Sequence, residues 1–208
     1  MTESSFVYRF EPGNRAGAPP LLLLHGTGGD ENDLLQLGAM ISPGSTLISP
    51  RGRVLEQGMP RFFRRLAEGV FDEEDVRKRA LELGAFVESV RQRYAIEAPV
   101  AVGFSNGANI AAALILMKPD SLAGAVLLRA MVPLSDPPRA RLDGKPVLIL
   151  SGQADPIIST ANAARLSAML SDAGANVVHK TLPAGHQLSQ ADVRLARDWI
   201  ARLDAQVV

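Results

Sequence analysis

The chain has 208 residues, of which 47% are hydrophobic and 21% charged, so it is long enough to bury a sizeable core and has an ordinary globular composition. Lys and Arg total 22, as do Asp and Glu, and this zero net charge argues against a general nucleic-acid-binding protein, which would present a basic face. The absence of cysteine excludes disulfides, thiolate catalysis and cysteine-ligated metals.

The first five residues contain no basic segment followed by an apolar one, which a secretory signal would require. No uninterrupted apolar run approaches the ~20 residues that span a membrane. We therefore expect a cytoplasmic protein with no stable membrane insertion, folded as a single domain over residues 1–208.

Apolar runs of strand length alternate with helical patterns along the chain. Strands are expected at residues 6–10, 21–24, 46–49, 100–102, 125–128, 147–150 and 176–182. Helices are expected at residues 32–41, 73–94, 106–118, 159–173 and 191–203. Several of the strands lack polar alternation, as strands do when helices cover both faces of a parallel sheet. The pattern predicts an α/β fold with a doubly wound, mostly parallel sheet, in which 6–10 is an edge strand.

A glycine-rich loop, His25-Gly26-Thr27-Gly28-Gly29-Asp30, joins the strand at 21–24 to the next helix. Neither Gly-x-Gly-x-x-Gly nor a Walker lysine is present, so nucleotide binding is poorly supported. We expect His25 to anchor this loop and Asp30 to cap the helix. The stronger interpretation of the loop is half of an oxyanion hole, in which the backbone N–H of Thr27 faces the reacting carbonyl.

Residues 51–71 interrupt the alternation of strands and helices with a long connection, and such connections often line or cover sites. Met59, Phe62 and Phe63 form an apolar cluster in it, which we expect to line an acyl pocket. The alternative is that these three side chains pack into the core beneath the loop. Arg64 and Arg65 are expected to be solvated or paired with nearby acidic residues rather than to bind substrate. Those acidic residues are Glu68, Asp72 and Glu73.

The segment Gly103-Phe104-Ser105-Asn106-Gly107 reads Gly-x-Ser-x-Gly and lies between an apolar run and a helical pattern. A strand, a tight turn carrying Ser and then a helix is the context of a nucleophile elbow. The turn is crowded, so the positions flanking the serine must be nearly bare of side chain. We therefore predict that Ser105 is a nucleophile and that the Asn106 N–H is the second oxyanion donor.

A serine hydroxyl needs a base, and the base needs an acid that orients it. His186 and Asp155 each follow the end of a late strand, where sites form in parallel sheets. We predict these two as base and acid, with His179 as a second candidate base and Asp136 as a second candidate acid. The order Ser105, Asp155, His186 is that of α/β-hydrolases. A reversed order that begins at His25 would suit β-barrel proteases, which the alternating pattern disfavours.

These motifs, with Ser151-Gly152-Gln153-Ala154-Asp155-Pro156 and Gly185-His186, resemble the small carboxylesterase/phospholipase family of α/β-hydrolases, which includes acyl-protein thioesterases. The segment from Pro50 to Phe63 resembles a bacterial carboxylesterase subgroup. The resemblance implies hydrolysis of small acyl esters, no cofactor and frequently a homodimer. A separate lid domain does not fit in this length, so we expect a minimal cap. It places catalysis on Ser105, Asp155 and His186, and the oxyanion hole on Thr27 and Asn106. Acyl-protein thioesterases usually carry Gln where this chain has Asn106, which weakens an assignment to protein depalmitoylation.

The sequence thus predicts a serine carboxylesterase that acts on small to medium acyl esters through an acyl-enzyme. No His, Asp and Glu cluster has ligand spacing, so no metal is expected, and the expected partner is a small-molecule ester rather than nucleic acid. An acyl thioesterase or lysophospholipase of the same fold is the alternative enzyme. The non-enzymatic alternative is a ligand-binding protein of the same fold whose triad carries out no reaction.

Overall fold

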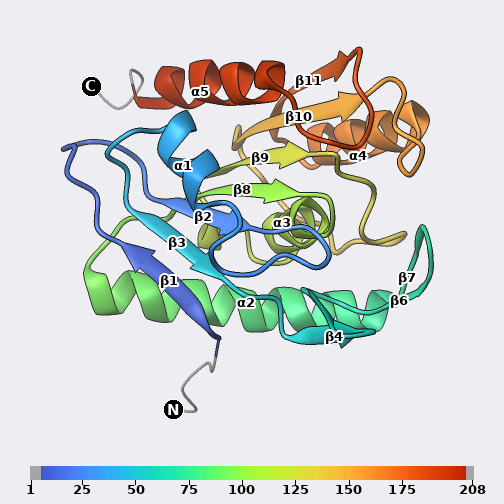
Figure 1. Cartoon of the computed structure of the whole chain (residues 1–208). Coiled ribbons are helices and arrows are strands. Elements are labelled where there is room, and N and C mark those ends of the chain that lie inside the picture. The colour runs from blue at the N-terminus through green and yellow to red at the C-terminus, as the bar shows by residue number, and fades with distance from the viewer. Residues whose placement is uncertain (1–5, 205–208) are drawn as a thin grey trace.

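The computed structural model describes residues 6–204, in which a seven-stranded sheet is covered by helices on both faces (Figure 1). The strand order is β1-β3-β2-β8-β9-β10-β11, and every neighbouring pair is parallel except β1 with β3. The strands are β1 (Tyr8–Glu11), β2 (Leu21–Leu24), β3 (Leu47–Pro50), β8 (Val100–Phe104), β9 (Gly124–Leu128), β10 (Pro146–Gly152) and β11 (Asn176–Leu182). The predicted mostly parallel α/β sheet is confirmed, and the expected edge strand is β1, which runs antiparallel to β3.

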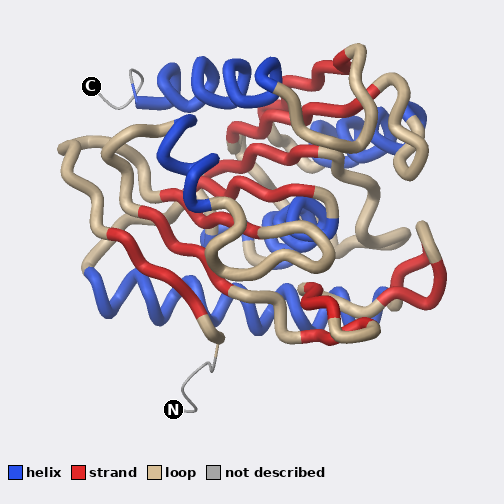
Figure 2. Tube along the Cα trace, viewed as in Figure 1, coloured by secondary structure: helices blue, strands red, loops and turns tan. Residues whose placement is uncertain are grey.

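Successive side chains of each central strand enter different cores, which explains why these strands are apolar throughout. In β2, Leu22 and Leu24 pack in one core and Leu21 and Leu23 in the other, all fully buried. Helices α2 (Glu73–Tyr94), α3 (Asn106–Met117) and α4 (Thr160–Asp172) contribute to the first core. Helices α1 (Leu35–Ile41) and α5 (Gln190–Asp204) cover the other face, as Figure 2 shows.

Capping residues define both ends of α2, whereas α1 does not begin where the sequence predicted. Asp72 caps α2 by accepting the Asp75 N–H, and Ala95 ends it in a left-handed conformation. The prediction that Asp30 caps a helix from residue 32 is wrong. Its carboxylate instead accepts the Asn32 N–H in a local turn, and α1 begins only at Leu35.

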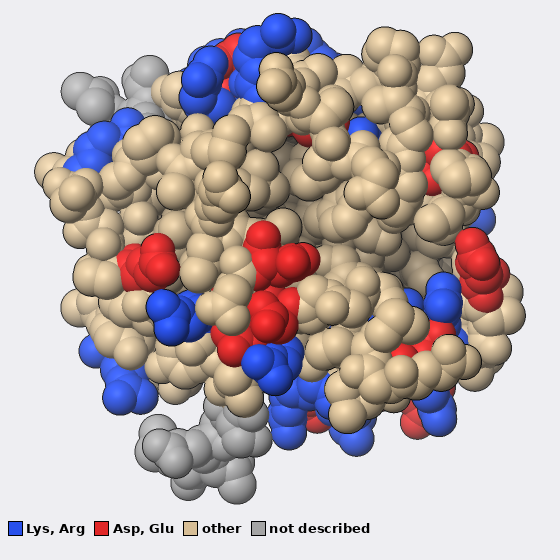
Figure 3. Space-filling model, viewed as in Figure 1, with Lys and Arg blue, Asp and Glu red and all other residues tan. Residues whose placement is uncertain are grey.

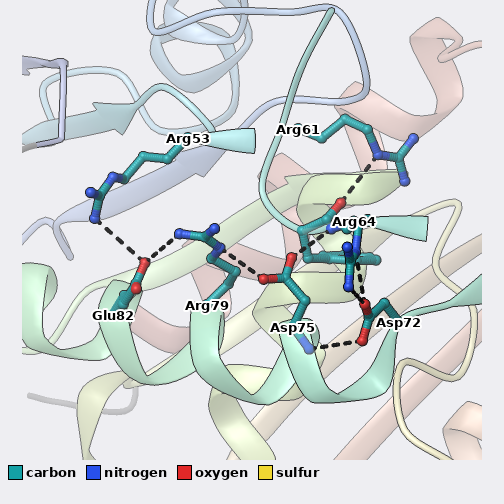
Figure 4. Close-up of polar contacts among 8 residues, drawn as sticks. Arg53, Arg61, Arg64, Asp72, Asp75, Arg79 and Glu82 are labelled. Carbon is teal, nitrogen blue, oxygen red and sulfur yellow. Dashed lines mark hydrogen bonds and ion pairs between the residues drawn. The ribbon is translucent and has the colours of Figure 1, made fainter. Parts of the chain in front are cut away.

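The predicted loop at residues 51–71 contains two small hairpins. Strands β4 (Val54–Glu56) and β5 (Met59–Arg61) form the first, and β6 (Arg65–Ala67) and β7 (Val70–Phe71) form the second. Polar contacts with α2 and its N-cap hold this region, as Figure 4 shows: Arg53 contacts Glu82, the Arg64 N–H donates to Asp75, and the Arg64 guanidinium pairs with Asp72. Within α2, Arg79 contacts both Asp75 and Glu82. The register signal in such short strands is weak, which is why the sequence suggested only a connection.

Charged groups of both signs lie beside one another on the face shown in Figure 3, without a broad field of one sign. Within residues 6–204, no helix is long and apolar enough to cross a bilayer.

Candidate active site

Ser105 lies in the turn between β8 and α3, at the carboxyl end of the sheet. Its φ of 51° is positive, a conformation that is strained for a residue with a side chain. Both flanking glycines are required by close backbone contacts. A Cβ at Gly103 would lie 2.5 Å from the Gly107 carbonyl oxygen, and one at Gly107 would lie 1.9 Å from the Leu24 carbonyl oxygen. The Gly-x-Ser-x-Gly pattern therefore forms the strained, crowded turn that the sequence predicted.

Ser105, His186 and Asp155 are joined by two hydrogen bonds. The Nε2 atom of His186 lies 3.0 Å from the Ser105 Oγ atom, and its Nδ1 atom lies 2.9 Å from the Asp155 Oδ2 atom. With the proton on Nδ1, the imidazole donates to the carboxylate and accepts from the hydroxyl. This is the geometry that a base needs to deprotonate a serine.

Asp155 follows β10 and is held as an anion. Its side chain is 1% exposed, and burial alone would raise its pKa. Hydrogen bonds from the Ile158 N–H, from His186 and from the Ile157 N–H outweigh burial, so the pKa of Asp155 lies below its ordinary value. The carboxylate can therefore orient His186 and stabilise its protonated form.

The other candidate residues lie elsewhere. Asp136 is exposed, and its backbone carbonyl accepts from Arg77. Buried His25 donates from Nδ1 to the Gly26 carbonyl and accepts the Gly52 N–H at Nε2, so it anchors its loop as predicted. Burial also lowers the pKa of His25.

His179 forms a second serine–histidine pair, with its Nε2 atom 2.9 Å from the Ser151 Oγ atom. Within residues 6–204, no carboxylate hydrogen-bonds to His179, and burial lowers its pKa. This pair therefore lacks the acid that orients His186.

The backbone N–H groups of Thr27 and Asn106 are available for an oxyanion. Neither donates a hydrogen bond to any part of the protein that the structure describes, and both residues line the cavity beside Ser105. Asn106 is the first residue of α3, so the positive end of the helix dipole adds to its N–H. Together these groups could stabilise negative charge on a carbonyl oxygen.

Residues 60–63 hold the segments that carry both of these N–H groups, a role that the sequence did not indicate. The Arg61 Nη1 atom donates to the Thr27 hydroxyl at 2.7 Å, and the Pro60 carbonyl accepts the Gly28 N–H at 2.9 Å. The Phe62 N–H donates to the Asn106 Oδ1 atom at 2.8 Å. The first hairpin thus ties the loop at Thr27 to the elbow.

Arg129 holds the loop that carries His186, and it too was missed from the sequence. Its guanidinium donates to the carbonyls of Gly185 and Gln187, on either side of the histidine, at 2.8 and 3.1 Å. The same guanidinium is fully buried against Asp192 of α5. An arginine placed directly after an apolar strand was the available signal.

A cavity of about 390 Å³ opens beside Ser105 and His186. Its apolar wall comes from Phe71, Phe104, Met131, Ile157 and Ile158, and its polar wall includes Arg61, Arg65, Glu68, Asn109 and Gln187. Among the described residues, no group of three or more His, Asp and Glu side chains is arranged to hold a metal ion.

The cavity is not built from the residues expected to form the acyl pocket. Phe62 and Phe63 are 3% and 0% exposed and belong to the core beneath the hairpins, so the pocket expectation is wrong for them and the core alternative is correct. Met59 is exposed near Gly28 and does not line the cavity. Arg64 pairs with Asp72 as expected, but Arg65 pairs with Glu56 and lines the cavity.

The phospholipase/carboxylesterase family is matched over residues 9–203, which is nearly the whole chain. The chain belongs to this family. Its α/β-hydrolase fold is also that of the Bacillus cereus carboxylesterase, with a TM-score of 0.93 and 44% identity over 97% of this chain and 96% of that one. MhqD of Bacillus subtilis (strain 168) is 45% identical over 86% of this chain and 90% of its own length. YahD, whose structure was determined with malic acid, has a TM-score of 0.89 and 31% identity over 95% of this chain and 98% of its own.

Proposed function

We propose that the protein is a serine carboxylesterase that hydrolyses small to medium acyl esters through an acyl-enzyme on Ser105. The observation that carries this proposal is the hydrogen-bonded chain from Asp155 through His186 to Ser105. Its serine end borders a cavity where the N–H groups of Thr27 and Asn106 have no partner among the described residues. A nucleophile, a base, an acid and two oxyanion donors are the parts that acyl transfer requires.

In the first half-reaction, the Ser105 Oγ atom attacks the ester carbonyl while His186 Nε2 takes the hydroxyl proton. The N–H groups of Thr27 and Asn106 stabilise the resulting oxyanion, and Asp155 stabilises the imidazolium. The bond between the carbonyl carbon and the alcohol oxygen then breaks. His186 gives its proton to that oxygen, so the alcohol leaves and the acyl group remains on Ser105.

In the second half-reaction, His186 takes a proton from water, and the hydroxide attacks the acyl-enzyme. A second oxyanion forms in the same position, and the bond from carbon to Ser105 breaks. His186 returns the proton to the serine oxygen. The products are one carboxylic acid and one alcohol for each ester and water consumed, and no cofactor takes part.

The experiment that tests this proposal is covalent labelling with a fluorophosphonate, followed by intact mass measurement. The wild type should gain one adduct and should release p-nitrophenol from p-nitrophenyl acetate. Ser105→Ala should lose both. Ser151→Ala is the matched control, because Ser151 also contacts a histidine but lies outside the cavity. Labelling that persists in Ser105→Ala would overturn the assignment of the nucleophile.

An acyl thioesterase or lysophospholipase is the alternative within the same chemistry. A cavity of 390 Å³ lies near the lower end of the range for small-molecule sites, which favours short acyl groups over long lipid chains. The structure of YahD contains malic acid, a small carboxylic acid, and this also supports a small ligand here. A ligand-binding protein without catalysis would give no burst of p-nitrophenol in proportion to the protein, whereas an acyl-enzyme would give one.

A further inference from the structure

One corner of the cavity beside Ser105 is lined by two arginines. Arg61, the last residue of β5, and Arg65, the first residue of β6, both border it. Figure 4 shows the guanidinium of Arg61 turned away from the ion-pair network that Arg64 and its neighbours form with α2. The Arg61 guanidinium therefore takes no part in that surface network of ion pairs.

Arg61 is buried although part of its hydrogen-bonding capacity is unused. The residue is 3% exposed, its Nε atom donates to the Phe63 carbonyl, and its Nη1 atom donates to the Thr27 hydroxyl. Within residues 6–204, Nη2 has no hydrogen-bond partner, yet it is not sealed from solvent. The space that Arg61 borders is the cavity, so the free N–H groups of Nη2 are available to a ligand there.

The two arginines share one carboxylate. Glu56 lies 3.1 Å from Arg61 and 2.8 Å from Arg65, so the three side chains carry a net charge of +1. Burial also lowers the pKa of Arg61, which indicates that its charge is incompletely compensated. Glu68 is the opposing charge at the cavity, but it is exposed, and water screens it more strongly than it screens Arg61.

The position of this corner assigns it to the acyl half of an ester. In the proposed mechanism, the leaving alcohol must lie next to His186, which protonates it. The oxyanion lies between Thr27 and Asn106, and Arg61 contacts Thr27 from the side of the hairpins. Ser105, the oxyanion and the alcohol occupy three of the four positions around the reacting carbon, which leaves the acyl chain as the group able to reach the part of the cavity that the arginines line.

We propose that Arg61 and Arg65 bind a carboxylate at the far end of the acyl group, so that the preferred substrates are hemiesters of short dicarboxylic acids. This inference rests on the proposed esterase function and narrows its substrate class. A guanidinium recognises a carboxylate through charge-assisted hydrogen bonds, and these gain strength in a largely desolvated site. Hydrolysis would release the free dicarboxylic acid and the alcohol.

The test compares substrates of matched size that differ in charge. Monoethyl succinate carries the carboxylate, ethyl succinamate and ethyl 4-methylpentanoate replace it by neutral groups of similar shape, and ethyl 4-(trimethylammonio)butanoate carries a cation. Ethanol release gives kcat/KM for each. We expect the wild type to prefer monoethyl succinate over both neutral esters by about tenfold or more, because hydrogen bonds to charged groups are stronger than neutral ones.

The variants are judged on the ratio of kcat/KM for monoethyl succinate to that for ethyl succinamate. Arg61→Met should lower this ratio by about tenfold, although both rates will fall because Thr27 loses a hydrogen bond. Arg65→Gln should lower it in the same direction, and because Arg65 is half-buried this variant decides the question if Arg61→Met fails to fold. Arg64→Gln is the matched control, since Arg64 points to Asp72 and does not line the cavity. It should leave the ratio unchanged.

Binding to Ser105→Ala, measured by calorimetry, provides a readout without catalysis: monoethyl succinate should bind more tightly than ethyl succinamate. Three outcomes would overturn the carboxylate site. The first is a kcat/KM for either neutral ester that equals or exceeds that for monoethyl succinate, and the second is a preference for the cationic ester. The third is a ratio of kcat/KM for monoethyl succinate to that for ethyl succinamate that stays at the wild-type value in both Arg61→Met and Arg65→Gln. Fluorophosphonate labelling of Ser105 in the same protein separates the two proposals. Labelling without a preference for the hemiester overturns the subsite alone, whereas absence of labelling overturns the esterase.

Discussion

Arg129 and Asp192 form a bidentate ion pair at the end of the sheet, with N to O distances of 2.7 and 3.0 Å. The two side chains are 0% and 1% exposed. Arg129 follows β9 and Asp192 lies in the first turn of α5, so the pair joins a central strand to the last helix. Because Arg129 also binds the carbonyls beside His186, the position of the proposed base depends on an interaction outside the cavity.

Removal of Asp192 should destabilise the protein strongly. Asp192→Ala leaves Arg129 as an unpaired buried charge, which typically costs about 3–5 kcal/mol. Urea unfolding at neutral pH measures this loss, and kcat should fall with it because the loop at His186 loses its support. Asp198→Ala on the same helix is the control, since Asp198 is half exposed and, within residues 6–204, pairs only with Arg197. Equal stability of the two variants would contradict the structural role of the pair.

The stability that Asp192 contributes should depend on pH in a way that follows from the pKa of its carboxyl group. Burial alone would raise it, but the hydrogen bonds from Arg129 and Ser189 lower it below its ordinary value. The native state therefore binds this proton less readily than the unfolded chain does. The stabilisation should be complete above about pH 5 and should be lost as the pH falls below about 4, through the native pKa. The gap in unfolding free energy between wild type and Asp192→Ala should narrow over this range.

Asp155→Asn should lower kcat by on the order of 10³–10⁴, because the amide no longer fixes the imidazole with its proton on Nδ1. The fold should be retained, since the Asn oxygen can still accept the N–H groups of Ile157 and Ile158. Initial rates with p-nitrophenyl acetate measure the effect. Asp136→Asn is the control and should change kcat little, because Asp136 is exposed away from the site. The opposite result would move the acid to the loop after β9.

Asn106→Ala should affect stability more than chemistry. The proposed oxyanion donor is the backbone N–H, which the substitution keeps, whereas the lost Oδ1 atom leaves the buried Phe62 N–H without a partner. An unsatisfied buried donor costs about 1–3 kcal/mol, which a thermal melt should detect. Loss of a true oxyanion donor lowers kcat by about 10²–10³. A loss of that size would mean that the side-chain amide takes part in the reaction.

Chain-length preference should respond to Met131 and not to Phe63. Met131→Ala enlarges the cavity and should shift the optimum toward longer acyl chains, since each buried methylene contributes about 0.8 kcal/mol. Phe63→Ala should instead lower stability by about 3–5 kcal/mol, because Phe63 is fully buried in the core. A series of p-nitrophenyl esters from acetate to decanoate measures the first effect, and urea unfolding measures the second. Identical chain-length profiles for Met131→Ala and the wild type would remove Met131 from the acyl wall.

The fold and the three residues joined beside the elbow could be predicted because their signals are local. Buried parallel strands such as β2 are apolar at every position, and the crowding around Ser105 restricts positions 103 and 107 to glycine. The cavity wall could not be predicted, because Phe62 and Arg61 are neighbours in sequence, yet Phe62 packs in the core and Arg61 lines the cavity. Only long-range pairing, such as Arg61 with Thr27, decides which side faces the site.

The ion pair of Arg129 and Asp192 also sets an order for assembly during synthesis. The elbow, β8 and α3 are complete once residue 117 has left the ribosome. Arg129, which holds the loop at residues 185–187, gains its carboxylate partner only when Asp192 is available. A nascent chain would therefore possess its nucleophile long before its base is held in place. Esterase activity should emerge only with the C-terminal helix, because a chain stalled before residue 192 lacks both the carboxylate partner of Arg129 and the helix that covers one face of the sheet.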